Sequence, residues 1–195
     1  MECKQLWNYS QELINQVPQY VYEGAGSIFC IGLVTFVAWK GLKVGLLYTS
    51  ALLLLEYILL LFCSTVFYRD PLPERKYDFQ PLWSYKAIEE GQTVLLSENM
   101  MNVMVFIPVG LLLGIAFKQM TWWKALLIGC SISISIESLQ FGFMKGFSEV
   151  DDVMHNTVGC IMGYIIYSIL VRIFTNTKLK LDYAYYQHNK VVNPE

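Results

Sequence analysis

The stretch that decides the fold is residues 122–174, which reads WWKALLIGCSISISIESLQFGF (122–143), MKGFSEV (144–150) and DDVMHNTVGCIMGYIIYSILVRIF (151–174). The first and third pieces are apolar and long enough to cross a bilayer, which takes about 20 mostly apolar residues in a helix. The turn between them is short. The end of one span and the start of the next are therefore expected at the same membrane face.

The whole chain has the composition of an integral membrane protein. Of its 195 residues, 55% are hydrophobic and 15% are charged, whereas soluble domains have roughly 45–50% apolar and about 25% charged residues. The apolar residues gather in blocks that predict an all-α membrane protein, a bundle of about five transmembrane helices. The predicted spans cover residues 21–39, 44–68, 100–117, 122–143 and 153–174.

These blocks divide the chain into an N-terminal amphipathic segment (1–20), a transmembrane domain (21–174) and a polar C-terminal tail (175–195). Apolar residues recur at helical spacing in the first segment, which is typical of a helix lying on the membrane surface. One long loop, residues 69–99, holds three prolines beside an apolar group that includes Trp83. We expect this loop to dip back to the membrane or to pack over the bundle.

Charge and cysteine content exclude several classes of protein. The formal net charge is −2 and the isoelectric point about 5.7, so the chain has no basic surface of the kind that binds nucleic acid. None of the five cysteines forms a CxxC or Cys/His metal motif. Lysine and arginine fall eight to six between the two sides of the predicted bundle. The positive-inside rule then favours an external N-terminus and an internal C-terminus, which places the 144–150 turn outside.

Polar residues follow one helix face in the 122–143 run. Ser133, Glu137, Gln140 and Met144 are spaced by four, three and four residues. Glu137 is six residues from Phe143, or roughly 9 Å along the helix axis. A carboxylate at that depth costs about 2.5–3.5 kcal/mol on insertion scales, so it must face protein or water.

The following run carries a matching polar face at its start. Asp152, Asn156, Gly159 and Gly163 share one side of the helix, and the two glycines form a GxxxG pattern that allows a close helix approach. Asp151 and Asp152 lie at the helix N-terminus, where negative charge is favoured, so helix capping is an alternative role for both. Asn102, Gln140 and Asn156 have the alternative role of hydrogen-bonding across helices.

Helix ends at one membrane face are thus predicted to bring together a polar cluster. The residues expected to bind there are Arg69, Asn102, Glu137, Gln140, Asp151, Asp152 and Asn156, with Asn99 beside them. Glu137 is the candidate for general acid–base chemistry. Asp151 and Asp152 are the weaker candidates for holding a divalent cation, since hard cations prefer carboxylate oxygens.

Three ordered blocks of this sequence resemble the VanZ-like family of membrane proteins. They are NVMVFIPVG (102–110), IESLQ (136–140), and VDD (150–152) followed by NTVG (156–159) and GY (163–164). The strongest part of the resemblance covers residues 99–174, with weaker matches at Arg69 and at 78–84. The chain departs from the family pattern at Lys145, where arginine is frequent. It departs again at Asp78 and Leu82, where the pattern often shows asparagine and an aromatic residue.

The resemblance implies a multi-pass cell-membrane protein that lowers susceptibility to lipophilic glycopeptide antibiotics of the teicoplanin type. One interpretation is a protein that binds or alters an envelope lipid or the drug at the outer membrane face. The alternative is an intramembrane hydrolase or transferase that acts on a lipid-linked substrate, with Glu137 as acid or base. The expected partners are membrane lipids and a lipid-linked cell-wall precursor or lipoglycopeptide, and nucleic acid is not expected.

Overall fold

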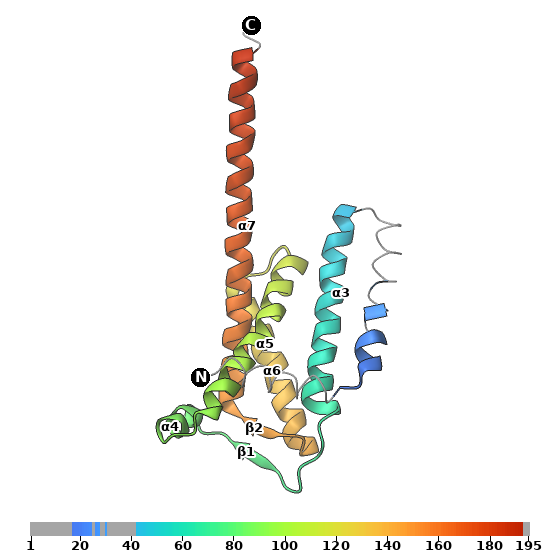
Figure 1. Cartoon of the computed structure of the whole chain (residues 1–195), viewed down its shortest axis with the longest axis vertical. Helices are drawn as coiled ribbons and strands as arrows, with labels where there is room; N and C mark the ends of the chain where they lie inside the picture. The colour runs from blue at the N-terminus through green and yellow to red at the C-terminus, as the bar shows by residue number, and fades with distance from the viewer. Residues whose placement is uncertain (1–16, 25, 28–29, 31–41, 193–195) are drawn as a thin grey trace.

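The structure, a computed structural model, describes residues 17–24, 26–27, 30 and 42–192. Four long helices run roughly side by side (Figure 1). They are α3 (Leu42–Phe62), which continues as the π-helical turn η1 (Cys63–Phe67), α5 (Val94–Ala116), α6 (Trp122–Phe143) and α7 (Val150–Val192).

All four helices are long and apolar enough to cross a membrane. Their spanning segments are Leu47–Phe67, Val94–Ala116, Trp122–Phe143 and Val150–Leu179, which match the last four predicted spans. The first predicted span, 21–39, and the amphipathic segment 1–20 fall mostly outside the described residues. The helical, membrane-spanning character expected from the apolar blocks is confirmed.

Two helix boundaries differ from the prediction. Helix α5 begins at Val94 and so extends into the loop expected to end at Asn99, because the polar face of its first turns is covered by protein. Helix α7 continues past the predicted end of the span at Phe174 and reaches Val192, well beyond the other helices (Figure 1). Its candidate spanning segment has 30 residues.

Helices α5 and α7 pack closely because glycines face each other's backbones. A Cβ on Gly159 would collide with the carbonyl oxygen of Val103, and a Cβ on Gly163 with that of Ile107. In return, a Cβ on Gly110 of α5 would collide with the carbonyl oxygen of Cys160. The predicted GxxxG pattern therefore mediates an internal helix contact in this chain.

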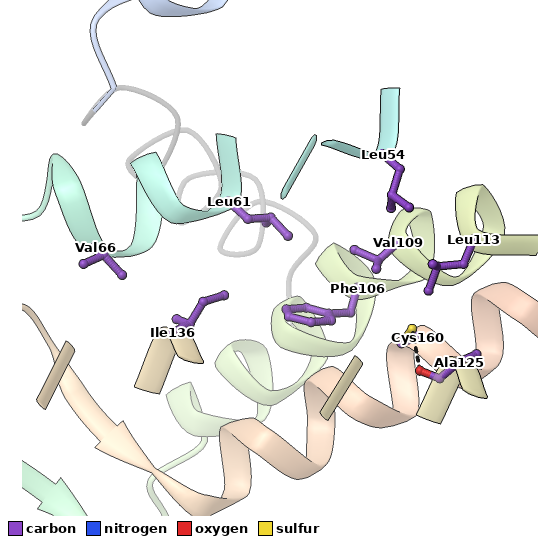
Figure 2. Packing of buried hydrophobic residues seen from close by; sticks show 9 residues of the cluster. All are labelled: Leu54, Leu61, Val66, Phe106, Val109, Leu113, Ala125, Ile136 and Cys160. Carbon is purple, nitrogen blue, oxygen red and sulfur yellow. Dashed lines mark hydrogen bonds between the residues drawn. The ribbon is translucent and has the colours of Figure 1, made fainter. Parts of the chain in front are cut away.

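A small apolar core fills the space between the four helices. Figure 2 shows side chains from α3, η1, α5, α6 and α7 gathered in one cluster. The thiol of Cys160 on α7 donates to the carbonyl oxygen of Ala125 on α6 at 3.3 Å, and Tyr57 of α3 donates to the Val105 carbonyl oxygen of α5 at 2.8 Å. The cluster consists of Leu54, Leu61, Val66, Phe106, Val109, Leu113, Ala125, Ile136 and Cys160.

One end of the bundle carries a roof formed by the long loop and the 144–150 turn. Strand β1 (Lys76–Asp78) pairs in parallel with β2 (Phe147–Glu149), with Tyr77 opposite Ser148, and helix α4 (Trp83–Glu89) follows. The roof lies at the lower end of the bundle in Figure 1. The long loop packs over the bundle, which is one of the two arrangements predicted for it. The strands were not predicted, because three residues are too few for a periodic pattern.

The glycine contact generates a stability prediction. We expect Gly163→Val to lower the free energy of unfolding by about 1–3 kcal/mol, since the added side chain forces two helix backbones apart. Thermal unfolding of the purified protein in detergent would measure this loss. The matched control is Gly142→Val on α6, where a Cβ has nothing within 4 Å. Equal unfolding temperatures for the two variants would contradict the proposed role of the contact.

Candidate functional site

A polar cavity of about 320 Å³ lies beneath the roof, at the end of the apolar core. Its floor includes Leu61, Phe106 and Ile136, which belong to the core cluster. Leu95, Val105 and Phe147 also line it, and the other lining residues are polar, four of them with carboxyl side chains. The polar lining residues are Thr65, Arg69, Glu98, Asn99, Asn102, Glu137, Gln140, Glu149, Asp152 and Asn156.

Six of the seven predicted binding residues line this cavity. One of them follows η1, and the other five belong to α5, α6 and α7. The ends of these helices meet at one end of the bundle. The lining members are Arg69, Asn102, Glu137, Gln140, Asp152 and Asn156. The seventh predicted residue, Asp151, lies outside the cavity.

Gln140 leaves an unused acceptor in the cavity wall. Its side-chain Nε2 donates to the Thr65 carbonyl oxygen at 3.1 Å. Its Oε1 is buried and, within the described part of the chain, accepts no hydrogen bond. Only 4% of the residue is exposed. A buried acceptor without a donor costs about 1–3 kcal/mol, so this oxygen favours a donor brought by a ligand or a water.

Asn102 and Asp152 connect α5 and α7 across the cavity. The Asn102 Nδ2 donates to Asp152 Oδ1 at 2.6 Å, as the close approach of these two helices allows. Glu98 lies one helical turn before Asn102 and also lines the cavity. Two carboxylates and an amide therefore share this side of the wall.

Asn156 acts one turn deeper, between α6 and α7. Its Nδ2 donates to the hydroxyl oxygen of Ser133 at 2.8 Å, and both residues are buried. This is the interhelical hydrogen bond expected of an asparagine in a membrane bundle. Asn156 thus both lines the cavity and holds two helices together.

Glu137 and Glu149 form the boundary between the bundle and the roof. The backbone N–H of Glu149 donates to Glu137 Oε2 at 3.0 Å. The indole Nε1 of Trp83 donates to Glu149 Oε2 at 2.8 Å. Glu137 is thus paired with strand β2, and β2 with helix α4, and both glutamates are buried.

Burial raises the pKa of Glu149 to about 8, and the neighbouring carboxylate of Asp152 adds to the rise. The indole hydrogen bond from Trp83 acts in the opposite direction, while Glu137 and Glu98 reinforce the increase. Repulsion among nearby carboxylates disfavours the charged form of each of them. A proton or another positive group in the cavity relieves that repulsion.

Arg69 contributes the cavity's only guanidinium. It is half-buried and close enough to Glu98, Glu137 and Asp152 to interact with their charges, yet it forms no ion pair within 4.0 Å among the described residues. Its Nη1 lies 2.6 Å from the point that a Cβ on Gly146 would occupy. Gly146 has φ +146°, a conformation that L side chains rarely adopt, so the backbone favours glycine there, whereas the flexible Arg69 side chain could move aside.

Asp151 fastens the roof to the bundle. Its Oδ1 accepts the backbone N–H of Leu82 at 2.6 Å, and its Oδ2 accepts both the backbone N–H and the hydroxyl of Ser84, at 3.0 and 2.6 Å. The carboxylate holds Leu82 in a left-handed conformation with φ 64° at the start of α4. Asn99 completes the junction by donating to the Ser84 hydroxyl at 3.1 Å.

Two further polar residues flank the cavity without lining it. His155 Nε2 lies 2.9 Å from the hydroxyl of Tyr85, which connects α7 to α4. Lys145, at the position where the family pattern often has arginine, donates to the Phe67 carbonyl oxygen at 2.8 Å. Its ammonium therefore connects the 144–150 turn to η1.

The arrangement does not favour a metal site at the two adjacent aspartates. Asp151 turns to Leu82 and Ser84 whereas Asp152 turns to Asn102, so the two carboxylates do not converge. Among the described residues no group of three His, Cys, Asp or Glu side chains could hold a metal ion.

Sequence reasoning missed two cavity carboxylates, Glu98 and Glu149. Glu98 precedes Asn102 by four residues, so helical phasing would have found it had α5 been extended to Val94. Glu149 lies in a strand with no periodic signal and reaches the cavity through the folding of the roof. No local pattern could have indicated its position.

The anchoring role of Asp151 can be tested directly. We expect Asp151→Ala to destabilise the protein by about 1–3 kcal/mol for each buried donor left without an acceptor. It should also speed trypsin cleavage after Lys86. Ser84→Ala removes one of the three hydrogen bonds to Asp151 and the acceptor for Asn99, but it keeps both backbone hydrogen bonds to Asp151, so we expect a smaller effect on trypsin cleavage. Unfolding in detergent and limited trypsin digestion would measure both, and an unchanged cleavage rate in Asp151→Ala would rule out the anchor.

The raised pKa of Glu149 predicts a pH dependence of stability. The folded state keeps a proton that the unfolded chain loses above its ordinary pKa, so stability should fall from about pH 5 to about pH 8. Glu149→Gln cannot ionise but keeps an acceptor for Trp83, and we expect it to lose less stability over this range. Unfolding temperatures measured across this pH range for the parent, Glu149→Gln and the exposed control Glu89→Gln would test this. Parallel curves of unfolding temperature against pH for the parent and Glu149→Gln would contradict it.

Comparison with known proteins identifies the family of this chain. A family model described as VanZ/LLP1 matches residues 28–172. Protein VanZ of Enterococcus faecium is 35% identical over 78 residues, which cover 40% of this chain and 48% of that relative. The match therefore spans about half the length of that protein. No solved structure matches the chain. Since the family model covers well over half of the sequence, this protein belongs to the VanZ/LLP1 family.

Proposed function

We propose that this protein binds the polar part of an amphiphile in the cavity and thereby lowers susceptibility to lipoglycopeptide antibiotics of the teicoplanin type. The observation that carries the proposal is the cavity itself, where four carboxyl groups and one guanidinium gather at the end of an apolar core. Arg69, which pairs with no carboxylate among the described residues, supports the same interpretation. Both kinds of group are suited to a polar ligand.

The surroundings of the cavity fit the headgroup region of a membrane. Exposed aromatic and apolar side chains surround this end of the bundle, among them Phe67, Tyr77, Phe79, Tyr85 and Phe143. Amphipathic and aromatic rings are enriched where a membrane meets water. With this end at that level, the cavity is in reach of lipid headgroups and of the polar parts of membrane-bound drugs.

An apolar groove next to the cavity suits the hydrocarbon part of the same ligand. The groove has a volume of about 270 Å³ and is lined by Ile134, Phe141 and Val153. Glu137 and Glu149 line both the groove and the polar cavity. An amphiphile can therefore place its headgroup among the carboxylates and an acyl chain along α6, with the two glutamates between them.

We further propose that this end of the protein faces outward, where lipoglycopeptides act. The uneven distribution of lysine and arginine supports this orientation. In this arrangement the protein withdraws an envelope lipid or the drug itself from the outer leaflet. The protein would then lower drug accumulation by occupancy, without converting the ligand.

The proposal predicts the effect of neutralising the cavity. Glu137→Gln and Asp152→Asn, expressed in a teicoplanin-susceptible bacterium, should return susceptibility toward that of cells lacking the protein. Each removes a charged hydrogen-bond acceptor, which lowers ligand affinity by about tenfold or more. The matched controls are Glu74→Gln and Asp70→Asn in the exposed part of the roof. Equal membrane levels, measured by immunoblot, are required for the comparison.

Two results would contradict this function. If both cavity variants leave teicoplanin susceptibility at the level of the parent, the cavity has no role in resistance. A lipid species that appears or disappears with the parent, and is restored in Glu137→Gln, would instead favour the intramembrane enzyme with Glu137 as acid or base. Mass spectrometry of lipid extracts from the same cultures distinguishes binding from conversion.

A further inference from the structure

The charge of the cavity restricts the ligand that it can bind. Four carboxylates line it, those of Glu98, Glu137, Glu149 and Asp152, against the single guanidinium of Arg69. Glu149 holds a proton below about pH 8 in the empty cavity, because burial and its acidic neighbours raise its pKa. An anionic ligand would oppose ionisation of these carboxyl groups further, and a neutral sugar would not favour it. A positively charged group would relieve their mutual repulsion.

The hydrogen-bonding groups of the wall restrict the ligand further. Four amide side chains line the cavity, and each directs an N–H at a protein oxygen: Asn99 at Ser84, Asn102 at Asp152, Asn156 at Ser133, and Gln140 at Thr65. The carboxyl oxygens of Glu98 and Asp152 are the acceptors that this part of the wall offers to a ligand, and Arg69 is its strongest donor. A group that donates several hydrogen bonds is complementary to the carboxyl oxygens of such a wall.

Primary ammonium is the cation that meets both conditions. It carries one positive charge and three N–H donors. A quaternary ammonium has no donors and is usually held by a cage of aromatic rings, whereas the aromatic lining here is limited to Phe106 and Phe147. A metal ion is disfavoured by the absence of a three-ligand group among the described residues.

We propose that the cavity selects a protonated primary amine carried by an amphiphile. The ammonium lies between Glu98 and Asp152, and Arg69 in the same wall meets a neighbouring anionic group of a zwitterion. This inference rests on the proposed headgroup-binding function and adds the charge and donor chemistry of the ligand. The amine can come from a membrane aminolipid or from an amine-bearing drug.

A set of amphiphiles with the same chain tests the proposal. The full-length protein in neutral detergent micelles is titrated with dodecylamine, dodecyltrimethylammonium, dodecanol and dodecyl phosphate, and binding is followed by calorimetry. We expect dodecylamine to bind about tenfold tighter than each of the others, because only it combines charge with N–H donors. Stronger binding of dodecyl phosphate or dodecanol would overturn the amine proposal.

Variants of the wall show whether binding occurs in the cavity. Glu98→Gln combined with Asp152→Asn should weaken dodecylamine binding by about tenfold or more. The Asn side chain keeps an acceptor for Asn102, so unfolding temperature should change little and reports on folding. Exposed Glu74→Gln should bind as the parent does. Equal dodecylamine affinity in the cavity variant and in Glu74→Gln would overturn the site.

Competition identifies the source of the amine. Phosphatidylethanolamine supplied in nanodiscs, compared with phosphatidylglycerol, reports on a lipid source, and teicoplanin added from water reports on a drug source. Displacement of dodecylamine by either amine-bearing competitor supports the proposal, and displacement by neither overturns it. If an anionic or neutral amphiphile binds the parent but not the cavity variant, the proposed function stands and the amine proposal fails. If no probe binds the parent more tightly than the cavity variant, both the proposed function and the amine proposal fail.

Discussion

The near-contact of the α5 and α7 backbones is the interaction on which the rest of the structure depends. Gly110, Gly159 and Gly163 remove the side chains that would separate the two helices. Without a hydrophobic driving force between helices in lipid, such close packing is a main source of association. The same approach brings Asn102 of α5 within hydrogen-bonding distance of Asp152 on α7. Helix packing and the polar cavity are therefore products of one contact.

The cavity also depends on the roof, which is built from loop segments fastened to the bundle by buried carboxylates. Asp151 holds the start of α4, and Glu137 holds strand β2 through the Glu149 N–H. Glu149 in turn accepts from Trp83. Acidic residues at the bundle end thus divide into those that assemble the roof and those, such as Asp152 and Glu98, whose charge is left to the cavity.

Helical periodicity predicted most of this arrangement, because 3.6-residue spacing places Glu137 with Gln140 and Asp152 with Asn156 on inward faces. The short turn then brought both pairs to one membrane face, and the family resemblance drew attention to the same residues. The roof could not be predicted in this way. Its strands are held by tertiary pairing, so the position of Glu149 and the divergence of Asp151 from Asp152 have no local signal.

The spacing of two charged residues along α7 indicates the membrane thickness that fits this helix. Asp152, in the cavity, and Arg172, exposed on the same helix, are 20 residues apart, or about 30 Å at 1.5 Å per residue. That distance equals the hydrocarbon thickness of a typical bilayer, about 30 Å. With the cavity at headgroup level on one side, Arg172 reaches the opposite interface without tilt. A thinner bilayer would force α7 to incline, and α5, locked to it at the glycines, would incline with it.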